Sequence, residues 1–416
     1  MKIVVIGTSN SVMGGNGFIK ALMLDHEVIQ LSSGRVPFFY HIKTIENNKA
    51  LIESSDLLLI DHYINDVNFY SEALGEEYNQ LCEDFYYLLS SINTRIINVL
   101  FPIRDLKKRD TITYYEQIKK SSRLYSLCVL DLNETPFSRH HFSDNIHITH
   151  DASYALGIVL GKELLDSDIG QKPQQGYCRN MPFKVINIED LPLKNNNAIK
   201  TFSNSLMRLK YLDVKDTFLL QNSSTAKLLS VGYLRVKNKE GHSGIMINGH
   251  KFSLSGYGYF HETIDIDLFG DLEVSPVLSN DLTLSNLMGR GLAKGVFSYC
   301  YLTEFFLYDK NSPFQIQSAS RTPFIISLPK LIDVVDRICS IKGSFQFPAL
   351  EEKTINLLRE MAIKNEGDNL KVAFDLMNLA NLARPKGPVI KSKLEEYRFK
   401  LNKEIESESE LKKSTI

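Results

Sequence analysis

The chain has few cysteines and almost no net charge. Its 416 residues include 48 lysines and arginines and 49 aspartates and glutamates, which leaves a formal net charge of -1. Such a balance creates no field that would gather nucleic acid or anionic lipid, so we expect neither as a partner. The five cysteines are odd in number, lie far apart in the sequence and form no Cys-x-x-Cys pair, which predicts reduced thiols and no disulfides. These residues are Cys82, Cys128, Cys178, Cys300 and Cys339.

Long apolar runs and a basic leader are also missing. No apolar run approaches the roughly 20 residues that span a bilayer, and no charged leader precedes the first apolar run, Ile3 to Ile6. We therefore expect a cytoplasmic protein that starts at Met1 and has no membrane span. A hydrophobic content of 43% over this length predicts a substantial core and two or three domains.

Up to about residue 166, short apolar runs alternate with amphipathic stretches. The runs are predicted strands, at residues 2–6, 27–31, 57–61, 95–101 and 126–132, and helical patterns lie between them. Strands that are apolar on both faces predict a parallel sheet covered by helices on each side. We expect an α/β fold, a doubly wound five-stranded parallel sheet whose ligand lies beyond the carboxyl ends of the strands.

The remaining chain divides into three further segments. A polar stretch at 167–182 is predicted to be a linker, and 183–345 shows short alternating runs separated by turns, typical of a β sandwich or jelly roll that could bind carbohydrate. Two stretches within it, 285–299 and 329–338, could instead be helical insertions. The last segment, 346–416, is predicted to be a helical tail.

The helical tail resembles one tetratricopeptide repeat. Ala373, Ala380 and Pro385 have the relative spacing of its small residues and terminal proline, whereas Met361 and Lys364 depart from the pattern. Because one repeat cannot bury its own apolar face, we expect the tail to pack on the β domain, on a second subunit or on a protein partner. An ordinary helical hairpin is the alternative. The charged end from residue 404 onward is predicted to be frayed.

The first strand leads directly into Gly7, Thr8 and Ser9, a turn with two interpretations. A phosphate-binding loop of the Rossmann type needs Gly-x-Gly-x-x-Gly, and the second and third glycines are absent here. Arg35, after the second strand, could meet a 2′-phosphate, but nicotinamide binding is disfavoured. The other interpretation is a nucleophilic serine.

The serine interpretation predicts polar partners at the other strand ends, and these are present. Asn65 and Asp66 follow the third strand. Asp144 and His147 follow the fifth and precede an amphipathic helix with Thr149 or Asp151 as its cap. Since the carboxyl ends of parallel strands share one edge of the sheet, we expect these groups near Ser9.

Over about residues 1–165, the sequence resembles the SGNH (GDSL-like) hydrolases and acyltransferases. The resemblance rests on four ordered blocks: Gly7-Thr8-Ser9, Gly34, Asn65-Asp66 and Asp144-Asn145-Ile146-His147. Thr8 replaces the usual aspartate before the serine, and Tyr63 replaces the glycine of the third block. We expect Thr8, Tyr63 and Asp66 to form the rim around the substrate.

The resemblance implies acyl transfer through a covalent ester. Ser9 would be the nucleophile, His147 the general base and acid, and Asp144 the group that orients the imidazole. The backbone N–H groups of Ser9 and Gly34 and the side-chain amide of Asn65 would form the oxyanion hole. No tightly bound cofactor is expected, and acetyl-CoA is the expected acyl donor.

Each block also has a purely structural interpretation. Ser9 and Ser11 could both cap the first helix, and Asn65-Asp66 is a common turn pair. A metal site is disfavoured because no second ligand cluster accompanies the histidines near Asp144, so we expect none. Those histidines are His140, His141, His147 and His150.

The expected function is an O-acetyltransferase acting on a bacterial surface polysaccharide, capsular or related, or on its precursor. An esterase that removes acetyl groups with water is the first alternative, and a non-catalytic glycan-binding or scaffold protein is the second. A hydrogen bond between Ser9 and His147 at an open rim would favour an enzyme. A rim plugged by Tyr63 would favour a binding protein.

Overall fold

The computed structural model of the chain forms two compact units, residues 1–335 and 336–416, and each is considered by itself. The residues that the structure describes are 1–12, 17–34, 36–67, 77–106, 112–135, 137–166, 172–173, 176–191, 193, 197–203, 208–220, 226–235, 241–254, 258–267, 271–285, 292–309, 311–312, 315–321, 352–383 and 387–413. Arg35 and Cys339 lie outside these ranges.

The first part of unit 1 is the predicted α/β domain. Its five strands pair in parallel in the order β2-β1-β3-β4-β5, which confirms the predicted fold class. The register sets Val5 beside Leu59 and Val99 beside Leu130. The strands are β1 (Lys2–Ile6), β2 (Glu27–Gln30), β3 (Leu57–Ile60), β4 (Arg95–Leu100) and β5 (Cys128–Asp131).

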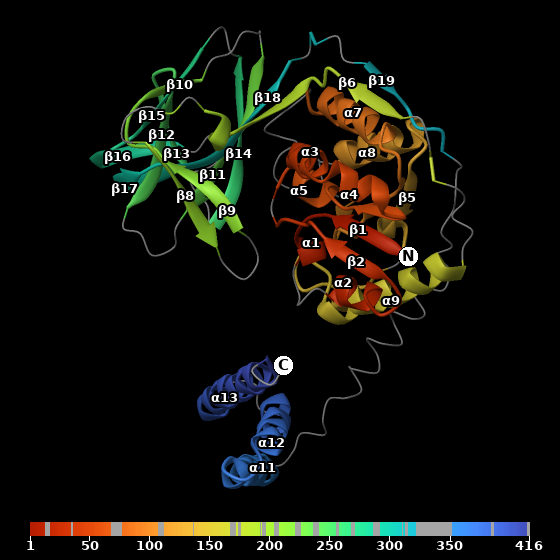
Figure 1. The fold of residues 1–416 in the computed structure, drawn as a ribbon, viewed down its shortest axis with the longest axis vertical. Helices are drawn as coiled ribbons and strands as arrows, with labels where there is room; N and C mark the ends of the chain where they lie inside the picture. The colour runs from red at the N-terminus through yellow and green to blue at the C-terminus, as the bar shows by residue number, and fades with distance from the viewer. Residues whose placement is uncertain are drawn as a thin grey trace. The chain divides into compact units, whose positions relative to one another are not determined.

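Helices cover both faces of this sheet (Figure 1). On one face α2 packs against α9, where Gly157 is needed because an added Cβ would collide with the Phe18 carbonyl. On the other face α7 packs against α3 and α8. The helices are α1 (Ser9–Val12), α2 (Gly17–Leu22), α3 (Phe38–Asn47), α4 (Lys49–Ser54), α5 (Tyr63–Asn65), α7 (Glu77–Ser90), α8 (Ile112–Leu124) and α9 (His150–Asp166).

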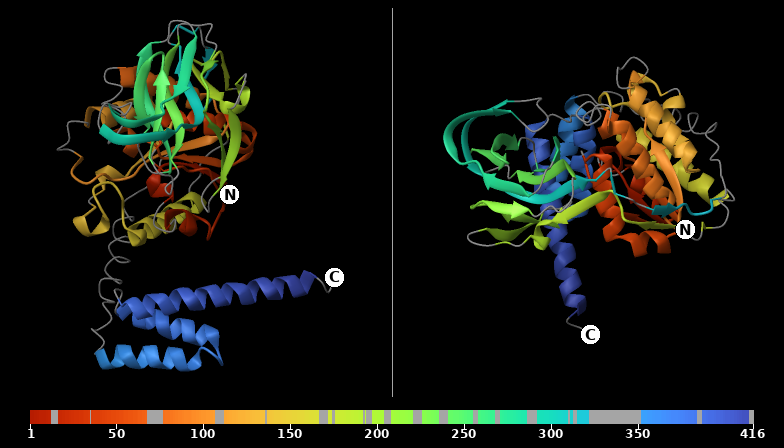
Figure 2. Two further views of the ribbon diagram at one scale, coloured as in Figure 1. Left: turned by 90° about the vertical axis from the view of Figure 1, so that its left-hand side faces the viewer. Right: turned by 90° about the horizontal axis from the view of Figure 1, so that it is seen from above.

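The second part of unit 1 is a β sandwich, as predicted. One sheet has the order β10-β15-β12-β17-β16 with β13 on β12, and the other has β14-β11-β18-β9-β8 with β7 on β18. Side chains from both sheets, Ile245 and Val274 from the first and Leu228 and Phe305 from the second, share one buried cluster. The two layers are visible in Figure 2.

The bounds of the sandwich strands are as follows: β7 (Phe183–Asn187), β8 (Ala198–Ser203), β9 (Arg208–Asp213), β10 (Phe218–Leu220), β11 (Lys227–Arg235), β12 (His242–Ile247), β13 (His250–Leu254), β14 (Gly258–Asp267), β15 (Leu272–Pro276), β16 (Ser279–Ser285), β17 (Leu292–Tyr299) and β18 (Tyr301–Tyr308).

Two expectations for this region are corrected. The predicted linker contains β6 (Tyr177–Arg179), which pairs with β19 (Gln315–Gln317) beside α7. Arg321 holds this region to the α/β domain by donating to the carbonyls of Leu89, Ile92 and Thr94. The possible helix at 285–299 is strand where it is described, since Ser285 ends β16 and the side chains of β17 alternate between buried and exposed. Residues 329–338 lie outside the described residues.

Unit 2 consists of α11 (Glu352–Asn365), α12 (Leu370–Ala383) and α13 (Pro388–Lys413). Consecutive helices pack on each other, and Ala373 and Ala380 are fully buried between them. Pro385 lies outside the described residues. The predicted frayed end is helical as far as Lys413, since its run of Glu and Lys residues has high helix propensity.

Within the described part of the chain, no helix is both long enough and apolar enough to cross a bilayer.

Candidate active site

Ser9 lies at the carboxyl end of β1, at the first residue of α1. The turn before it is tight, because a Cβ at Gly7 would come within contact distance of Ser11 Oγ and lie 3.2 Å from Asp61 Cβ. The glycine is therefore required by the packing of this turn on the end of β3. Only 7% of Ser9 is exposed, so the nucleophile candidate has a fixed position beside the sheet edge.

A buried carboxylate that was not predicted from the sequence holds the serine turn. Asp61 Oδ2 accepts hydrogen bonds from the Thr8 N–H at 3.2 Å, the Thr8 hydroxyl at 2.9 Å and the Ser11 hydroxyl at 3.1 Å. Burial raises the pKa of Asp61 to about 6, and the hydrogen bonds from Thr8 and Ser11 oppose that rise. Its signal in the sequence is an acidic residue directly after a fully apolar strand.

His147 approaches Ser9 from the loop between β5 and α9. Its Nε2 lies 2.8 Å from Ser9 Oγ, and its Nδ1 lies 2.6 Å from Asp144 Oδ2. Asp144 Oδ1 accepts from the backbone N–H groups of Ile146 and His147. Burial works against ionisation, but the hydrogen bonds from the His147 ring and these N–H groups lower the pKa of Asp144. The ionised carboxylate fixes Nδ1 as the protonated nitrogen, so Nε2 is free to accept the serine proton.

Asn10 ties the loop of His147 to the serine turn, a role that the sequence analysis missed. Its amide nitrogen donates to the Ile146 carbonyl at 2.9 Å, and its amide oxygen accepts from the Ile148 N–H at 3.3 Å. The two bonds flank His147 on both sides. No local pattern reveals this contact, because it forms only when the chain folds.

The proposed oxyanion donors lie around the loop that follows β2. The Ser33 N–H donates to the Gly7 carbonyl at 2.8 Å, which places Gly34 next to the serine turn. A Cβ added at Gly34 would meet no heavy atom within 4 Å in the described part of the chain, so space exists there for a ligand atom. Asn65 Nδ2 donates one hydrogen to the Val36 carbonyl at 3.1 Å and retains a second N–H.

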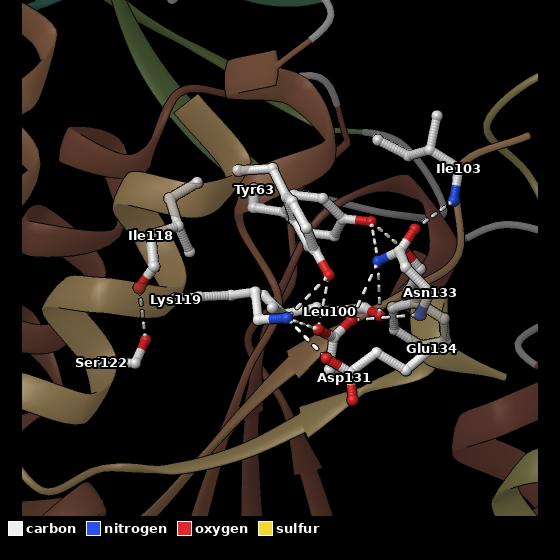
Figure 3. A network of polar contacts seen from close by, with 11 residues as sticks. Tyr63, Leu100, Ile103, Ile118, Lys119, Ser122, Asp131, Asn133 and Glu134 are labelled. Atoms are coloured by element: carbon white, nitrogen blue, oxygen red, sulfur yellow. Dashed lines mark hydrogen bonds and ion pairs between the residues drawn. The ribbon is translucent and has the colours of Figure 1, made fainter. Parts of the chain in front are cut away.

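Thr8, Tyr63 and Asp66 do not form the expected rim, because all three are fully buried. The Tyr63 hydroxyl donates to the Phe101 carbonyl and accepts from Asn133 Nδ2 at 2.8 Å, just beyond the carboxyl ends of β4 and β5 (Figure 3). Tyr63 therefore belongs to an internal polar network and does not plug the site.

Asp66 forms a second histidine–carboxylate contact that is separate from the first. His62 Nδ1 lies 2.7 Å from Asp66 Oδ2, and the other ring nitrogen contacts the Tyr86 hydroxyl at 2.7 Å. Burial lowers the pKa of His62 to about 3 and raises the pKa of Asp66. This pair is enclosed in the core, and its two ring nitrogens contact a carboxylate and a phenol rather than a serine.

Of the other histidines of the metal alternative, His140 lies against His141, with ring centroids 4.0 Å apart, and both contact the Ser138 hydroxyl. His141 is buried and its Nδ1 accepts from the Ser138 N–H at 3.0 Å, whereas His150 stacks near the ring of Tyr154. Among the described residues, no three His, Cys, Asp or Glu side chains gather as metal ligands do.

A cavity of about 550 Å³ borders the loop of Asp144 on the side of β4 and β5. Arg104, Asn133 and Arg139 line it. Arg104 also supports the loop, since its backbone N–H donates to the Asn145 carbonyl at 3.0 Å and its guanidinium donates to the Asn145 side chain.

Comparison with known proteins finds no matching family model and no matching curated protein. Among solved structures, a lipase/acylhydrolase from Enterococcus faecalis is 17% identical with a TM-score of 0.32, covering 39% of this chain and 94% of its own. A lipolytic protein of the G-D-S-L family from Desulfitobacterium hafniense is 16% identical with a TM-score of 0.32, covering 39% and 98%. An acetyl xylan esterase from Geobacillus stearothermophilus is 14% identical with a TM-score of 0.31, covering 38% and 91%. The similarity to each of these structures extends over about two fifths of this chain.

Proposed function

We propose that this protein is a serine-dependent acyl-transfer enzyme. The observation that carries the proposal is the continuous chain of contacts from Ser9 Oγ through the His147 imidazole to the Asp144 carboxylate. A serine hydroxyl is a weak nucleophile at neutral pH and needs an adjacent general base. The arrangement supplies that base and the carboxylate that orients it.

The reaction proceeds in two steps, acylation of Ser9 and transfer of the acyl group to an acceptor. Ser9 Oγ attacks the carbonyl carbon of an ester or thioester while its proton moves to His147 Nε2. The tetrahedral intermediate then expels the alcohol or thiol, which takes that proton, and acyl-Ser9 remains. In the second step an acceptor hydroxyl loses its proton to Nε2 and attacks acyl-Ser9, and Ser9 recovers its proton from His147 as the ester leaves.

The charge that develops on the carbonyl oxygen needs donors that are already in place. The Ser9 and Gly34 N–H groups and the remaining amide N–H of Asn65 are the proposed donors. One such donor contributes about 10²–10³ in rate in related chemistry. The open space at Gly34 supports this assignment, because the oxyanion could approach the backbone there.

The proposed reaction is O-acetyl transfer from acetyl-CoA to a bacterial surface polysaccharide, capsular or related, or to its precursor. The sandwich that follows the α/β domain supports a large acceptor, since a hydrolase of small esters needs no second domain. Esterase activity with water is the second candidate, and the 55% exposure of the Asp144 side chain favours it. A binding protein without activity is less favoured because Tyr63 leaves the site open.

The test compares wild type with Ser9→Ala in two assays, cleavage of 4-nitrophenyl acetate and release of CoA from acetyl-CoA, each with and without polysaccharide. We expect Ser9→Ala to abolish both activities. CoA release that depends on polysaccharide indicates a transferase, and ester cleavage without transfer indicates an esterase. Equal activity of the variant and wild type would contradict the serine mechanism.

A further inference from the structure

A cavity of about 510 Å³ lies where the α/β domain meets the sandwich. We call it the junction pocket. Ser33, Tyr40, Lys43 and Asn47 line it from the α/β domain, and strand residues such as Thr303 and Glu304 line it from the sandwich. Its volume lies within the roughly 300–1,000 Å³ of small-ligand pockets.

The junction pocket adjoins the reaction centre through one loop. Ser33, which lines the pocket, donates its N–H to the Gly7 carbonyl, two residues before Ser9. Gly34, the proposed oxyanion donor, is the next residue along the chain. A ligand in the pocket therefore lies beside the loop that faces the reacting carbonyl.

The walls of the pocket are fixed by contacts between the two domains. Lys43 forms an ion pair of 2.6 Å with Glu304, only 1% of which is exposed. Two residues after Glu304 on β18, the ring of Phe306 contacts the rings of Phe39 and Tyr40. These contacts place α3 and β18 at a set separation, so the pocket is preformed.

The lining chemistry favours a neutral, hydroxyl-rich ligand. Lys43 pairs with Glu304 and Lys210 with Glu189, so those charges are compensated, and Asp190 disfavours phosphate groups. Amide groups that can donate and accept hydrogen bonds come from Asn47 and Asn187, and the half-buried Tyr40 offers a ring on which a sugar could stack.

One buried hydroxyl in the lining has no protein partner. Thr303 is 4% exposed, and its Oγ1 makes no hydrogen bond within the part of the chain that is described. A buried hydroxyl without a partner costs free energy unless a ligand or water satisfies it. A sugar hydroxyl is a suitable partner because it both donates and accepts.

We propose that the junction pocket binds the carbohydrate part of the substrate, next to the carbonyl that Ser9 attacks. This inference rests on the proposed function, and it assigns the sugar to the residues of α3, β7 and β18 that line the pocket. The acyl donor does not enter it.

The test uses two substrates, acetylated xylo-oligosaccharides and 4-nitrophenyl acetate. Asn47→Trp fills the pocket from an exposed position at the end of α3, and Lys49→Trp, outside the lining, is the matched control. We expect Asn47→Trp to raise KM for the oligosaccharide about tenfold or more, the loss expected when a bound ring is displaced. Its kcat/KM for 4-nitrophenyl acetate should stay within about twofold, and Lys49→Trp should change neither.

A milder variant and a binding assay separate the pocket from the chemistry. Thr303→Val removes the hydroxyl at nearly constant volume and should weaken oligosaccharide binding about two- to tenfold. Calorimetric titration of Ser9→Ala, with and without Asn47→Trp, measures the same loss without turnover.

Any one of three results would overturn the pocket assignment. The first is unchanged oligosaccharide binding in Asn47→Trp, and the second is a wild type that cleaves the aryl ester but neither binds nor deacetylates the oligosaccharide. The third is impaired consumption of acetyl-CoA by Asn47→Trp when no sugar is present. Equal aryl-ester cleavage by wild type and Ser9→Ala would instead overturn the proposed function.

Discussion

The turn that carries Ser9 is buried, whereas the loop that carries Asp144 and His147 faces solvent. Ser9 is 7% exposed and its neighbour Thr8 is fully buried, while the Asp144 side chain is 55% exposed. The buried turn is held by Asp61 beneath it. The geometry of the exposed loop depends instead on a few hydrogen bonds to neighbouring elements.

This contrast indicates how each half of the site tolerates change. In the buried turn, the contacts of Asp61 belong to the core, so their loss should appear in the free energy of unfolding. The contacts that reach the exposed loop, from Asn10 to Ile146 and Ile148 and from Arg104 to Asn145, set the position of His147. Their loss should appear in kcat.

The largest effect should come from removing the imidazole. His147→Ala deletes the base that accepts the Ser9 proton, and we expect kcat for 4-nitrophenyl acetate to fall about 10⁴-fold or more. The melting temperature should change little because the His147 side chain, 17% exposed, lies outside the buried core. His150→Ala, three residues away with a side chain that is 46% exposed, is the matched control and should retain activity. Similar losses in both variants would contradict the assignment.

The next effect concerns stability and pH. Because the pKa of Asp61 is about 6 in the folded protein and 3.8 is its ordinary value, the unfolded chain loses this proton first as pH rises. Asp61 therefore stabilises the folded protein below about pH 4, and this contribution is lost by about pH 6. The free energy of unfolding should fall by roughly 3 kcal/mol over that range.

Asp61→Asn should remove that decline. Urea unfolding of both proteins from pH 4 to pH 7 gives the difference in the free energy of unfolding at each pH. We expect the wild type to lose stability relative to the variant over this range. A difference that stays constant would show that Asp61 keeps an ordinary pKa.

Asp144→Asn tests the exposed carboxylate. In serine proteases, loss of the buried triad aspartate lowers kcat about 10⁴-fold. Here water can partly solvate the imidazolium, and we expect a loss of about 10²-fold in kcat with KM nearly unchanged. Steady-state kinetics on the aryl ester measures it. A loss equal to that of His147→Ala would mean that solvent gives no compensation.

The smallest effect should come from the tether of the exposed loop. Asn10→Ala removes both bonds that flank His147, and misplacement of a catalytic group by about 1 Å can cost up to about 10²-fold. Since Asp144 still orients the ring, we expect roughly a tenfold fall in kcat. Ser11→Ala, which breaks a contact on the buried turn, should lower stability more than kcat. The reverse pattern would contradict the comparison of the two halves.

Local patterns in the sequence predict the sheet and the reacting side chains but not their supports. Apolar runs such as Leu57–Ile60 identify buried strands, and Ser9 and His147 follow strands where a parallel sheet collects its ligands. Asn10 and Tyr63 could not be assigned from the sequence, because their partners come from distant loops. Strand β6 was missed for the same reason, since its pairing with β19 joins segments far apart in the chain.

The most direct test of the central proposal is to trap the acyl-enzyme. Wild type is mixed with 4-nitrophenyl acetate, quenched in acid within the first turnovers, digested and analysed by mass spectrometry, with His150→Ala and Ser9→Ala in parallel. We predict one acetyl group on the peptide that contains Ser9, at Ser9 itself, in wild type and His150→Ala and none in Ser9→Ala. Acetylation at another residue, or turnover by Ser9→Ala at the wild-type rate, would contradict the account.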